Sequence, residues 1–379
     1  MEKNKVIGIL GLGSMGKIIA RDLYNTFSGQ VIYLVRDINS VKSLAKKYLA
    51  EIRYADVSKP KTLIKSFNGI DVVIHAVHHE FNLNVMKSCL KSKTNYVDLG
   101  GLYHYTKKQL KLNRQFQKAN LTAILGIGAS PGITNVMAKY ASKFFNKIEN
   151  IEIKIGYKDF SEYKQVSPLS SSYSIQTLLE EFSWKPAVFA NGKVKFVKPI
   201  SGRENYKFPN PVGIQKPQYT LHSEIATLPY TLKAKNVSFK IAFDDEFVNK
   251  IKMLEELGFI SDEKIKIGGN KFNIKKISLE ILKNLPKTIP EKINQYEIIR
   301  VILSNKDKEI IMDAKISGIN ETSDKDTGVP PSIISQMIAD RKITDKGVFP
   351  PESIIPEKEF FKELAKRKIY IYKNNMRVN

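Results

Sequence analysis

Three glycines near the N-terminus have the spacing of a phosphate-binding loop. Gly11, Gly13 and Gly16 form the pattern G-x-G-x-x-G within KVIGILGLGSMGKIIARDL. The first glycine of such a loop allows a tight turn, the second lets the backbone approach a pyrophosphate, and the third lets helix and strand pack closely. The free N–H groups of the helix that follows, around Ser14 and Met15, then bind the phosphates. The pattern predicts a nucleotide site only where a strand precedes it and a helix follows.

The end of the second predicted strand bears on which dinucleotide binds. Residues 31–35 are typical of a strand. The strand ends at Val35, and Arg36 and Asp37 follow it. A carboxylate about 20 residues beyond the glycines holds the ribose 2′-hydroxyl of NAD, whereas an arginine accommodates a 2′-phosphate. Val35 occupies the acidic position and Arg36 follows it, which favours NADP. If the register shifts by two residues, Asp37 takes the carboxylate role and NAD binds instead.

Further cofactor contacts are expected where the next strands end. Asp56 follows the third predicted strand, and Ala76, Val77 and His78 follow the fourth. Because ligands bind outside the carboxyl ends of strands in an open α/β sheet, these residues are predicted to line the cofactor, with 76–78 at the nicotinamide ribose or ring. The alternative for His78 is a solvated loop histidine.

The run His78-His79-Glu80 invites a metal interpretation. Adjacent side chains diverge in a strand, and the helical spacing H-E-x-x-H is absent. We therefore predict no metal site.

Two polar stretches are candidates for proton transfer and amine binding. HSEIATLP, at 222–229, places His222 two residues before Glu224, and either side chain could serve as general acid or base toward an amine. Asp98 in YVDLGG ends a predicted central strand, where it would bind the substrate amine or orient a catalytic group. The alternatives are a satisfied polar turn for HSE and a helix N-cap for Asp98.

Other residues are candidates for substrate recognition. Arg203 and Lys240 could bind a substrate carboxylate, although a surface role is open for each. Thr227 belongs to the polar stretch above, and Gly132 lies at a strand–helix junction in GASPGITN. Both are included among the predicted substrate-binding residues.

Alternating strands and helices must position these side chains. Short apolar runs predict strands at 5–10, 31–35, 52–55, 71–77, 95–99 and 122–126, and helical periodicity predicts helices at 40–48, 81–91 and 105–119. Alternation of this kind predicts a doubly wound parallel sheet of the Rossmann type, which supplies the context that the glycine motif requires.

The chain changes character after a predicted helix at 133–145. From about residue 148 it becomes strand-rich, with a hairpin signal at Asn191-Gly192 and a second turn at 305–307. This predicts a separate α+β domain. Helical and extended segments return near the C-terminus.

Composition excludes several classes of protein. The 379 residues carry a formal charge of +23, but the lysines are spread along the chain, which favours a basic surface over a nucleic-acid site. Such a surface would attract anionic substrates and a phosphorylated cofactor. No apolar run is long enough to span a membrane, no signal peptide is visible, and the one cysteine, Cys89, makes no intrachain disulfide. A cytoplasmic protein is expected.

Six stretches together resemble the saccharopine dehydrogenase-like superfamily. They are GLGSMG, DVVIHAV…NYVDLGG, GASPGITN, HSEIATLP, DTGVPPSI and GVFPPE, in this order along the chain. The chain departs from the pattern at Ser130, before the Pro-Gly pair, and at HAVHHEF, where members often carry a proline-containing stretch.

The resemblance implies a fold and an activity. The dinucleotide-binding domain would comprise residues 1–135 and 327–379, and the inserted domain, 136–326, would carry substrate recognition and homodimer contacts. The implied activity is NAD(P)-dependent oxidoreduction at the CH–NH group of an amino acid or an amino-acid-derived secondary amine. A saccharopine-type reductase comes first, followed by lysine 6-dehydrogenase and carboxynorspermidine dehydrogenase. A non-catalytic dinucleotide-binding regulator is the alternative from another class.

Overall fold

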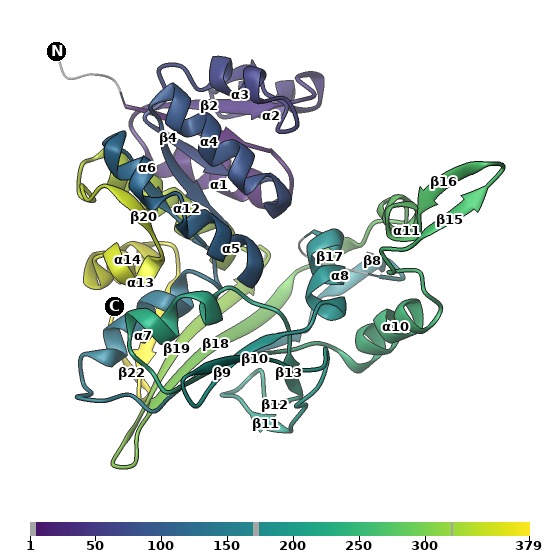
Figure 1. Ribbon diagram of the computed structural model, residues 1–379. Helices are drawn as coiled ribbons and strands as arrows, with labels where there is room; N and C mark the ends of the chain where they lie inside the picture. The colour runs from purple at the N-terminus through teal and green to yellow at the C-terminus, as the bar shows by residue number, and fades with distance from the viewer. Residues whose placement is uncertain (1–4, 170–173, 320) are drawn as a thin grey trace.

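The N-terminal part of the chain folds into a parallel sheet with helices on both faces (Figure 1). This computed structural model describes residues 5–169, 174–319 and 321–379. From one edge to the other, the strands are β20 (Gly347–Phe349), β6 (Thr122–Ile124), β5 (Asn95–Asp98), β4 (Val72–His75), β1 (Val6–Leu10), β2 (Gln30–Val35) and β3 (Glu51–Tyr54). All adjacent pairs are parallel, and the order 3-2-1-4-5-6 is that of the Rossmann fold. The predicted fold class is confirmed.

The two faces of this sheet are buried by separate groups of helices. One face packs apolar side chains of α3 (Pro60–Ser66), α4 (Asn82–Ser92) and α6 (Asn113–Lys118) against the strands. The other packs those of α1 (Ser14–Thr26) and α2 (Lys42–Lys47). The central strands β1 and β4 are short and almost wholly apolar because they are covered on both sides. The single helix predicted at 105–119 is wrong: α5 (Leu102–Leu110) ends before α6 begins.

The C-terminal segment returns to complete this domain, as expected. β20 pairs with β6, and α12 (Lys325–Ala339) packs on α1 so closely that a Cβ on Gly328 would overlap Ile18. Buried Asp22 of α1 accepts hydrogen bonds from Ser332 Oγ at 2.6 Å and from Arg367 Nε at 2.9 Å. These contacts join the two ends of the chain. We refer to this unit as the nucleotide domain.

A second sheet, mostly antiparallel, forms the other half of the molecule. Its order is β10 (Lys193–Phe196), β9 (Ala187–Ala190), β14 (Asn236–Ala242), β7 (Asn150–Asp159), β18 (Asn294–Ser304), β19 (Glu309–Ile319), β21 (Ile369–Lys373) and β22 (Met376–Arg377), with β13 (Pro217–Tyr219) also paired to β14. Only β7 and β14 run parallel. Both predicted turns are confirmed as hairpins, joining β9 to β10 and β18 to β19.

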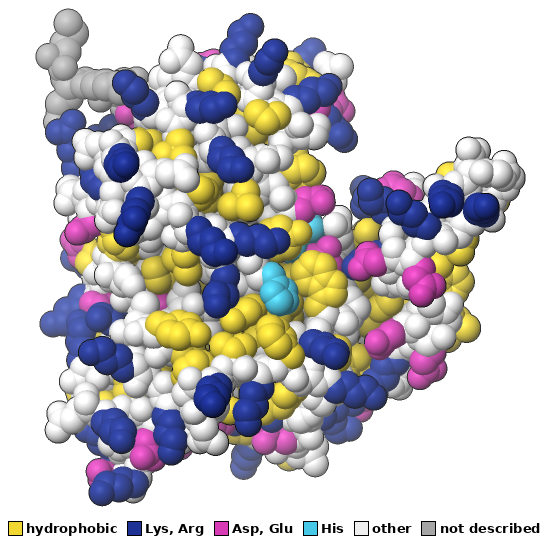
Figure 2. Space-filling view, in the orientation of Figure 1, with side chains coloured by type: hydrophobic (Ala, Val, Ile, Leu, Met, Phe, Trp, Pro, Cys, Tyr) yellow, Lys and Arg dark blue, Asp and Glu magenta, His cyan; other side chains and the backbone are white. Residues whose placement is uncertain are grey.

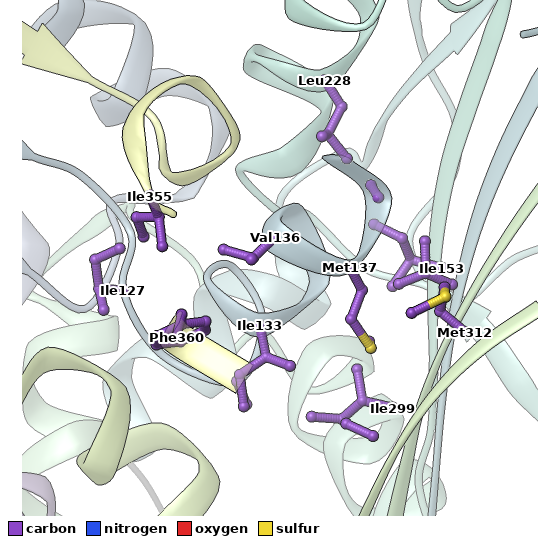
Figure 3. Close-up of a cluster of buried hydrophobic side chains, with 14 of the residues drawn as sticks. Ile127, Ile133, Val136, Met137, Ile153, Leu228, Ile299, Met312, Ile355 and Phe360 are labelled. Carbon is purple, nitrogen blue, oxygen red and sulfur yellow. The ribbon is translucent and has the colours of Figure 1, made fainter. Parts of the chain in front are cut away.

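Helix α7 (Ile133–Ser142) connects the two sheets. Figure 3 shows its apolar side chains between the mixed sheet and the C-terminal segment that contains α13 (Pro351–Ile354) and α14 (Glu357–Lys366). The packed residues are Ile133, Val136 and Met137 from α7, Ile153, Ile299 and Met312 from the sheet, and Ile355 and Phe360 from the C-terminal segment. One continuous apolar cluster thus extends from one sheet to the other.

An arm projects from the mixed sheet (right in Figure 1). It comprises α8 (Ile175–Ser183), α10 (Asp245–Glu256), α11 (Ile274–Lys283) and the hairpin of β15 (Lys264–Ile267) and β16 (Asn270–Asn273). Three small pieces complete the described elements: the pair β8 (Glu162–Gln165) and β17 (Ile289–Lys292), the pair β11 (Tyr206–Lys207) and β12 (Ile214–Gln215), and the short helix α9 (Leu228–Thr231).

The division into 1–135 plus 327–379 and 136–326 remains a prediction. One part of it does not match the strand pairing, because β21 and β22 extend the mixed sheet rather than the parallel one. In β21, Ile369 and Ile371 point into the core and the tyrosines between them are only partly buried. Among the described residues, no helix is both long and apolar enough to cross a membrane.

Candidate active site

The three glycines occupy the turn between β1 and α1, and each has the geometry that its predicted role requires. Gly11 adopts φ +94°, and a Cβ there would overlap Val77. A Cβ on Gly16 would overlap the carbonyl oxygen of Gly11, so only glycine allows α1 to pack against β1 here. A Cβ on Gly13 would meet nothing within 4 Å. Gly13 also caps α1 without a side chain, which leaves the first N–H groups of the helix for a ligand.

The polar residues after β2 favour Arg36 over Asp37 as the cofactor contact. The Asp37 carboxylate accepts hydrogen bonds from the backbone N–H groups of Asn39 at 3.0 Å and Ser40 at 3.4 Å. It is therefore engaged in its own turn. Arg36 is exposed directly after the strand. This geometry supports the predicted 2′-phosphate contact.

The residues predicted at the ends of β3 and β4 differ in what they contact. Asp56 Oδ1 accepts hydrogen bonds from the Ser58 backbone N–H at 3.0 Å and the Ser58 hydroxyl at 2.7 Å, which lower the Asp56 pKa. The Asp56 carboxylate therefore stabilises the loop that follows β3. Its contact with the cofactor remains a prediction, and the geometry does not support it. Ala76 donates its N–H to Leu10, and Val77 packs against Gly11. Residues 76 and 77 therefore border the glycine turn.

His78 and His79 do not diverge, and the reason given for excluding a metal is wrong. β4 ends at His75, so His78 lies in a loop and His79 begins a short 3₁₀ helix, η2 (His79–Phe81). Their ring centroids are 4.0 Å apart, and both rings face Glu180 of α8.

Asp98 is buried and is the acceptor for several hydrogen bonds within the protein. Its side chain accepts hydrogen bonds from Gln109 Nε2 at 2.5 Å, Gly126 N–H at 2.6 Å, Tyr96 OH at 2.9 Å and Gly100 N–H at 2.9 Å. Burial raises its pKa, against the effect of these donors. The N-cap of α5 is Gly101, so the N-cap alternative does not apply. Contact of Asp98 with substrate remains a prediction, and this burial does not favour it.

Asp98→Asn is expected to destabilise the protein by about 3 kcal/mol, because an amide leaves at least one buried donor without an acceptor. Denaturant unfolding measures this loss. The matched control is exposed Asp307→Asn, expected within about 0.5 kcal/mol of the parent. If Asp98→Asn retained full stability but lost turnover, the catalytic assignment of Asp98 would be restored.

His222 and Glu224 lie in a buried hydrogen-bonded network. His222 Nδ1 is 2.8 Å from Glu224 Oε2, and the His222 ring stacks on Phe239 with centroids 3.8 Å apart. Glu224 is fully buried and also accepts hydrogen bonds from the hydroxyls of Ser130 and Thr134. The Nδ1 atom of His222 faces Glu224, so Nε2 is the ring nitrogen that could exchange a proton with a substrate.

The charges of this pair stabilise each other. Burial by itself lowers the His222 pKa, but the Glu224 carboxylate outweighs burial and raises it. Burial likewise raises the Glu224 pKa, and His222 together with Ser130 brings it below its ordinary value. An ionised Glu224 beside a readily protonated imidazole is the arrangement that a proton-transfer group needs.

The loop after β6 positions this network at the carboxyl edge of the parallel sheet. Ser130 and Gly132 belong to this loop, and a Cβ on Gly132, at φ +129°, would overlap Gly128. Three strand spacings, about 14 Å, separate β6 from β1 and its glycine turn. A dinucleotide bound at the glycine turn would extend along this edge toward His222.

The other predicted substrate residues have protein partners. Thr227 is buried, and its backbone carbonyl accepts a hydrogen bond from Thr231 Oγ1 at 3.1 Å. Arg203 pairs with Asp245 of α10, and Lys240 Nζ bonds Glu204 at 3.0 Å. The structure therefore brings Gly132, His222 and Glu224 together, whereas Arg203 and Lys240 are in ion pairs of their own.

Several polar residues at this edge were missed. Ser130 and Thr134 bind Glu224, and Asp326, at the start of α12, has its pKa raised to about 7 by burial and the Asp324 charge. Buried side-chain atoms of Gln218, Thr220 and Ser223 have no hydrogen-bond partner among the described residues. The motif GASPGITN contains Ser130 and Thr134, but their partner Glu224 lies 94 and 90 residues further along the chain.

Comparison with known proteins covers nearly the whole chain. Residues 7–124 match the family model described as the saccharopine dehydrogenase NADP binding domain, and residues 128–369 match the saccharopine dehydrogenase C-terminal domain. A carboxynorspermidine synthase of Vibrio alginolyticus is 24% identical over 86% of this chain and 83% of its own length. A carboxyaminopropylagmatine dehydrogenase of Synechocystis sp. is 23% identical over 92% of each chain.

A solved structure has the same fold. The apo saccharopine dehydrogenase (L-Glu forming) of Saccharomyces cerevisiae superposes with a TM-score of 0.72, covering 98% of this chain and 99% of that one at 18% identity.

Proposed function

The chain belongs to the saccharopine dehydrogenase family, and from this premise we propose that it oxidises or forms the CH–NH bond of a carboxylated secondary amine. It is an NADP-binding oxidoreductase of that family. The relatives that span most of the chain carry the names of enzymes of carboxylated polyamines. We therefore place a carboxynorspermidine-type amine ahead of saccharopine, which came first on the sequence alone.

The His222–Glu224 pair at the carboxyl edge of the parallel sheet is the observation that carries this proposal. Oxidation of a CH–NH bond removes a hydride from carbon and a proton from nitrogen. The glycine turn and Arg36 would hold NADP, which would accept the hydride when bound. His222 Nε2 takes the amine proton, and the buried Glu224 carboxylate stabilises the imidazolium that results. In the reverse direction the same imidazolium protonates the nitrogen.

The unpartnered polar atoms beside His222 suit a polar substrate. Gln218, Thr220 and Ser223 lie on β13 or in the segment that leads to η3 (Glu224–Ala226). A buried polar group without a partner is costly, and a substrate carboxylate or amine would satisfy it. We assign these residues to substrate recognition in preference to Arg203 and Lys240.

Turnover with defined amines tests the proposal. The purified chain is assayed by the absorbance of reduced nicotinamide against carboxynorspermidine, saccharopine, lysine, and norspermidine, which lacks the carboxylate. We expect NADP(H)-dependent turnover with a carboxylated amine and little with its decarboxylated form. Tight NADP(H) binding without turnover on any of these would instead support the non-catalytic regulator.

Arg36→Ala is expected to weaken NADP(H) binding about 10- to 100-fold and to leave NAD(H) binding unchanged, because only the 2′-phosphate makes the charge-assisted contact. Fluorescence titration of both cofactors checks this, with Asp37→Asn as the neighbouring control. An equal loss for both cofactors, or a parent protein that prefers NAD(H), would contradict the assignment.

We further propose a cytoplasmic homodimer in which the arm makes the subunit contact. The arm exposes large apolar side chains, among them Leu257, Ile267 and Ile281, each more than half exposed. Scattered apolar side chains are common on surfaces, but several on one projecting element are typical of an interface. Light scattering of the purified chain measures its oligomeric state.

A further inference from the structure

Two adjacent histidines and one glutamate converge between the nucleotide domain and the arm. His79 Nε2 is 2.8 Å from Glu180 Oε2, and His78 Nε2 is 3.4 Å from the same oxygen. One ligand atom from each residue lies within 4.8 Å of the others. The side chains of His79 and Glu180 are only 5% and 6% exposed. Figure 2 shows the hollow between the nucleotide domain and the arm, where this cluster lies.

These atoms approach one another without forming hydrogen bonds. Among the described residues, His78 Nε2, His79 Nε2 and Glu180 Oε2 are all buried and have no hydrogen-bond partner. Both ring nitrogens lie within 3.4 Å of the same carboxylate oxygen, but neither contact has the angles of a hydrogen bond. An ion shared by the three atoms would satisfy all of them.

We propose that His78, His79 and Glu180 bind a divalent transition metal of the zinc type, with a fourth position open to water. Two imidazoles and one carboxylate form a ligand set of catalytic zinc sites, whereas magnesium and calcium prefer oxygen ligands alone. Ligands about 2.1 Å from a tetrahedral metal lie about 3.4 Å apart. The observed 3.4 Å separation matches this value, and the 2.8 Å separation needs only a small opening.

Surrounding residues orient the three ligands. Gln176 Nε2 donates to Glu180 Oε1 at 3.3 Å, and Glu80 Oε1 is 3.5 Å from His78 Nδ1. In this structure His78 Nδ1 accepts a hydrogen bond from the Glu80 backbone N–H at 3.4 Å. With Nε2 on a metal, Nδ1 would carry the proton and would donate to the Glu80 carboxylate instead, a carboxylate–histidine–metal arrangement. The Tyr105 ring, with its centroid 4.9 Å from that of His79, packs against the other side of the site.

The site joins the two halves of the molecule. His78 and His79 follow β4 of the nucleotide domain, whereas Glu180 belongs to α8 of the arm. A bound metal therefore fixes α8 against the carboxyl edge of the parallel sheet. This property is additional to the oxidoreductase activity and does not depend on it.

Cobalt titration tests the proposal without cofactor or substrate. Tag-free protein is treated with a chelator and titrated with CoCl₂, then with ZnCl₂. We expect one equivalent of Co²⁺ to give the visible absorption of a four-coordinate site, Zn²⁺ to displace it, and either metal to raise the melting temperature. His79→Ala and Glu180→Gln should each weaken Co²⁺ binding at least about 100-fold, and Glu80→Gln about 10-fold.

His104→Ala is the matched control, because His104 stacks on Phe196 outside the cluster and its loss should leave Co²⁺ affinity unchanged. Failure of the folded parent protein to bind either metal would overturn the proposal. Unchanged Co²⁺ affinity in folded Glu180→Gln would also overturn the proposal. This variant serves as the test if His79→Ala does not fold.

Discussion

Replacing Gly13 with valine is expected to weaken NADP(H) binding at least about 100-fold while the chain remains folded. The Cβ position of Gly13 is open and its φ of −70° suits any L-residue, so the protein itself has room for the new side chain. That room is where the pyrophosphate must approach the N-terminus of α1. Hydrogen bonds to a charged phosphate contribute about 1.5–3 kcal/mol each, so the loss of one or two weakens binding by about 100-fold.

Gly16→Val provides the contrast. A side chain at Gly16 overlaps the backbone of Gly11, so this variant should lose stability rather than cofactor affinity alone. Thermal unfolding without cofactor and fluorescence titration with NADPH separate the two outcomes. Normal NADPH affinity in folded Gly13→Val would reduce the glycine motif to a structural turn.

Local patterns were sufficient to predict six of the seven strands of the parallel sheet. Each of its first six strands combines a short apolar run with a nearby turn or helix start, and the observed bounds lie within two residues of the predicted ones. The return of β20 to this sheet came from the family resemblance, because a three-residue strand has too little periodicity to be found by pattern. β21 could have been predicted from the sequence, because Ile369 and Ile371 alternate with tyrosines as in a strand.

The candidate site was harder to predict because its contacts are long-range. Asp98 receives donors from Gln109 and Gly126, which lie 11 and 28 residues further along the chain. The sequence places a carboxylate at a strand end, which suits a ligand contact and a buried structural centre equally well. Only the packing of α5 and the loop after β6 around Asp98 distinguishes the two.

The convergence of His78 and His79 on Glu180 was not predicted from the sequence, because it too depends on long-range contacts. The exclusion of a metal assumed that His78 and His79 lie in a strand, where neighbouring side chains diverge. Their convergence depends on the end of β4 at His75 and on Glu180, which is about a hundred residues away. Neither fact is visible in the run HHE.

His222→Asn is expected to lower turnover about 10²- to 10⁴-fold, the usual contribution of a general acid or base, with NADP(H) affinity unchanged. Asparagine retains a polar side chain next to Glu224 but cannot exchange a proton near neutral pH. Steady-state kinetics with the best amine substrate measure the effect, and His104→Asn controls for removal of a histidine outside this network. A loss confined to KM would make His222 a binding residue.

Glu224→Gln tests whether Glu224 acts through His222. The Glu224 carboxylate raises the His222 pKa, so its neutral replacement should lower that pKa. Amine oxidation requires the neutral imidazole, and its rate falls as pH drops through the His222 pKa. In Glu224→Gln this acidic limb of the kcat profile should therefore move to lower pH, in addition to a fall in kcat. A variant that lost activity equally at every pH would show that Glu224 serves only to hold Ser130 and Thr134 in place, and the orienting role would have to be withdrawn.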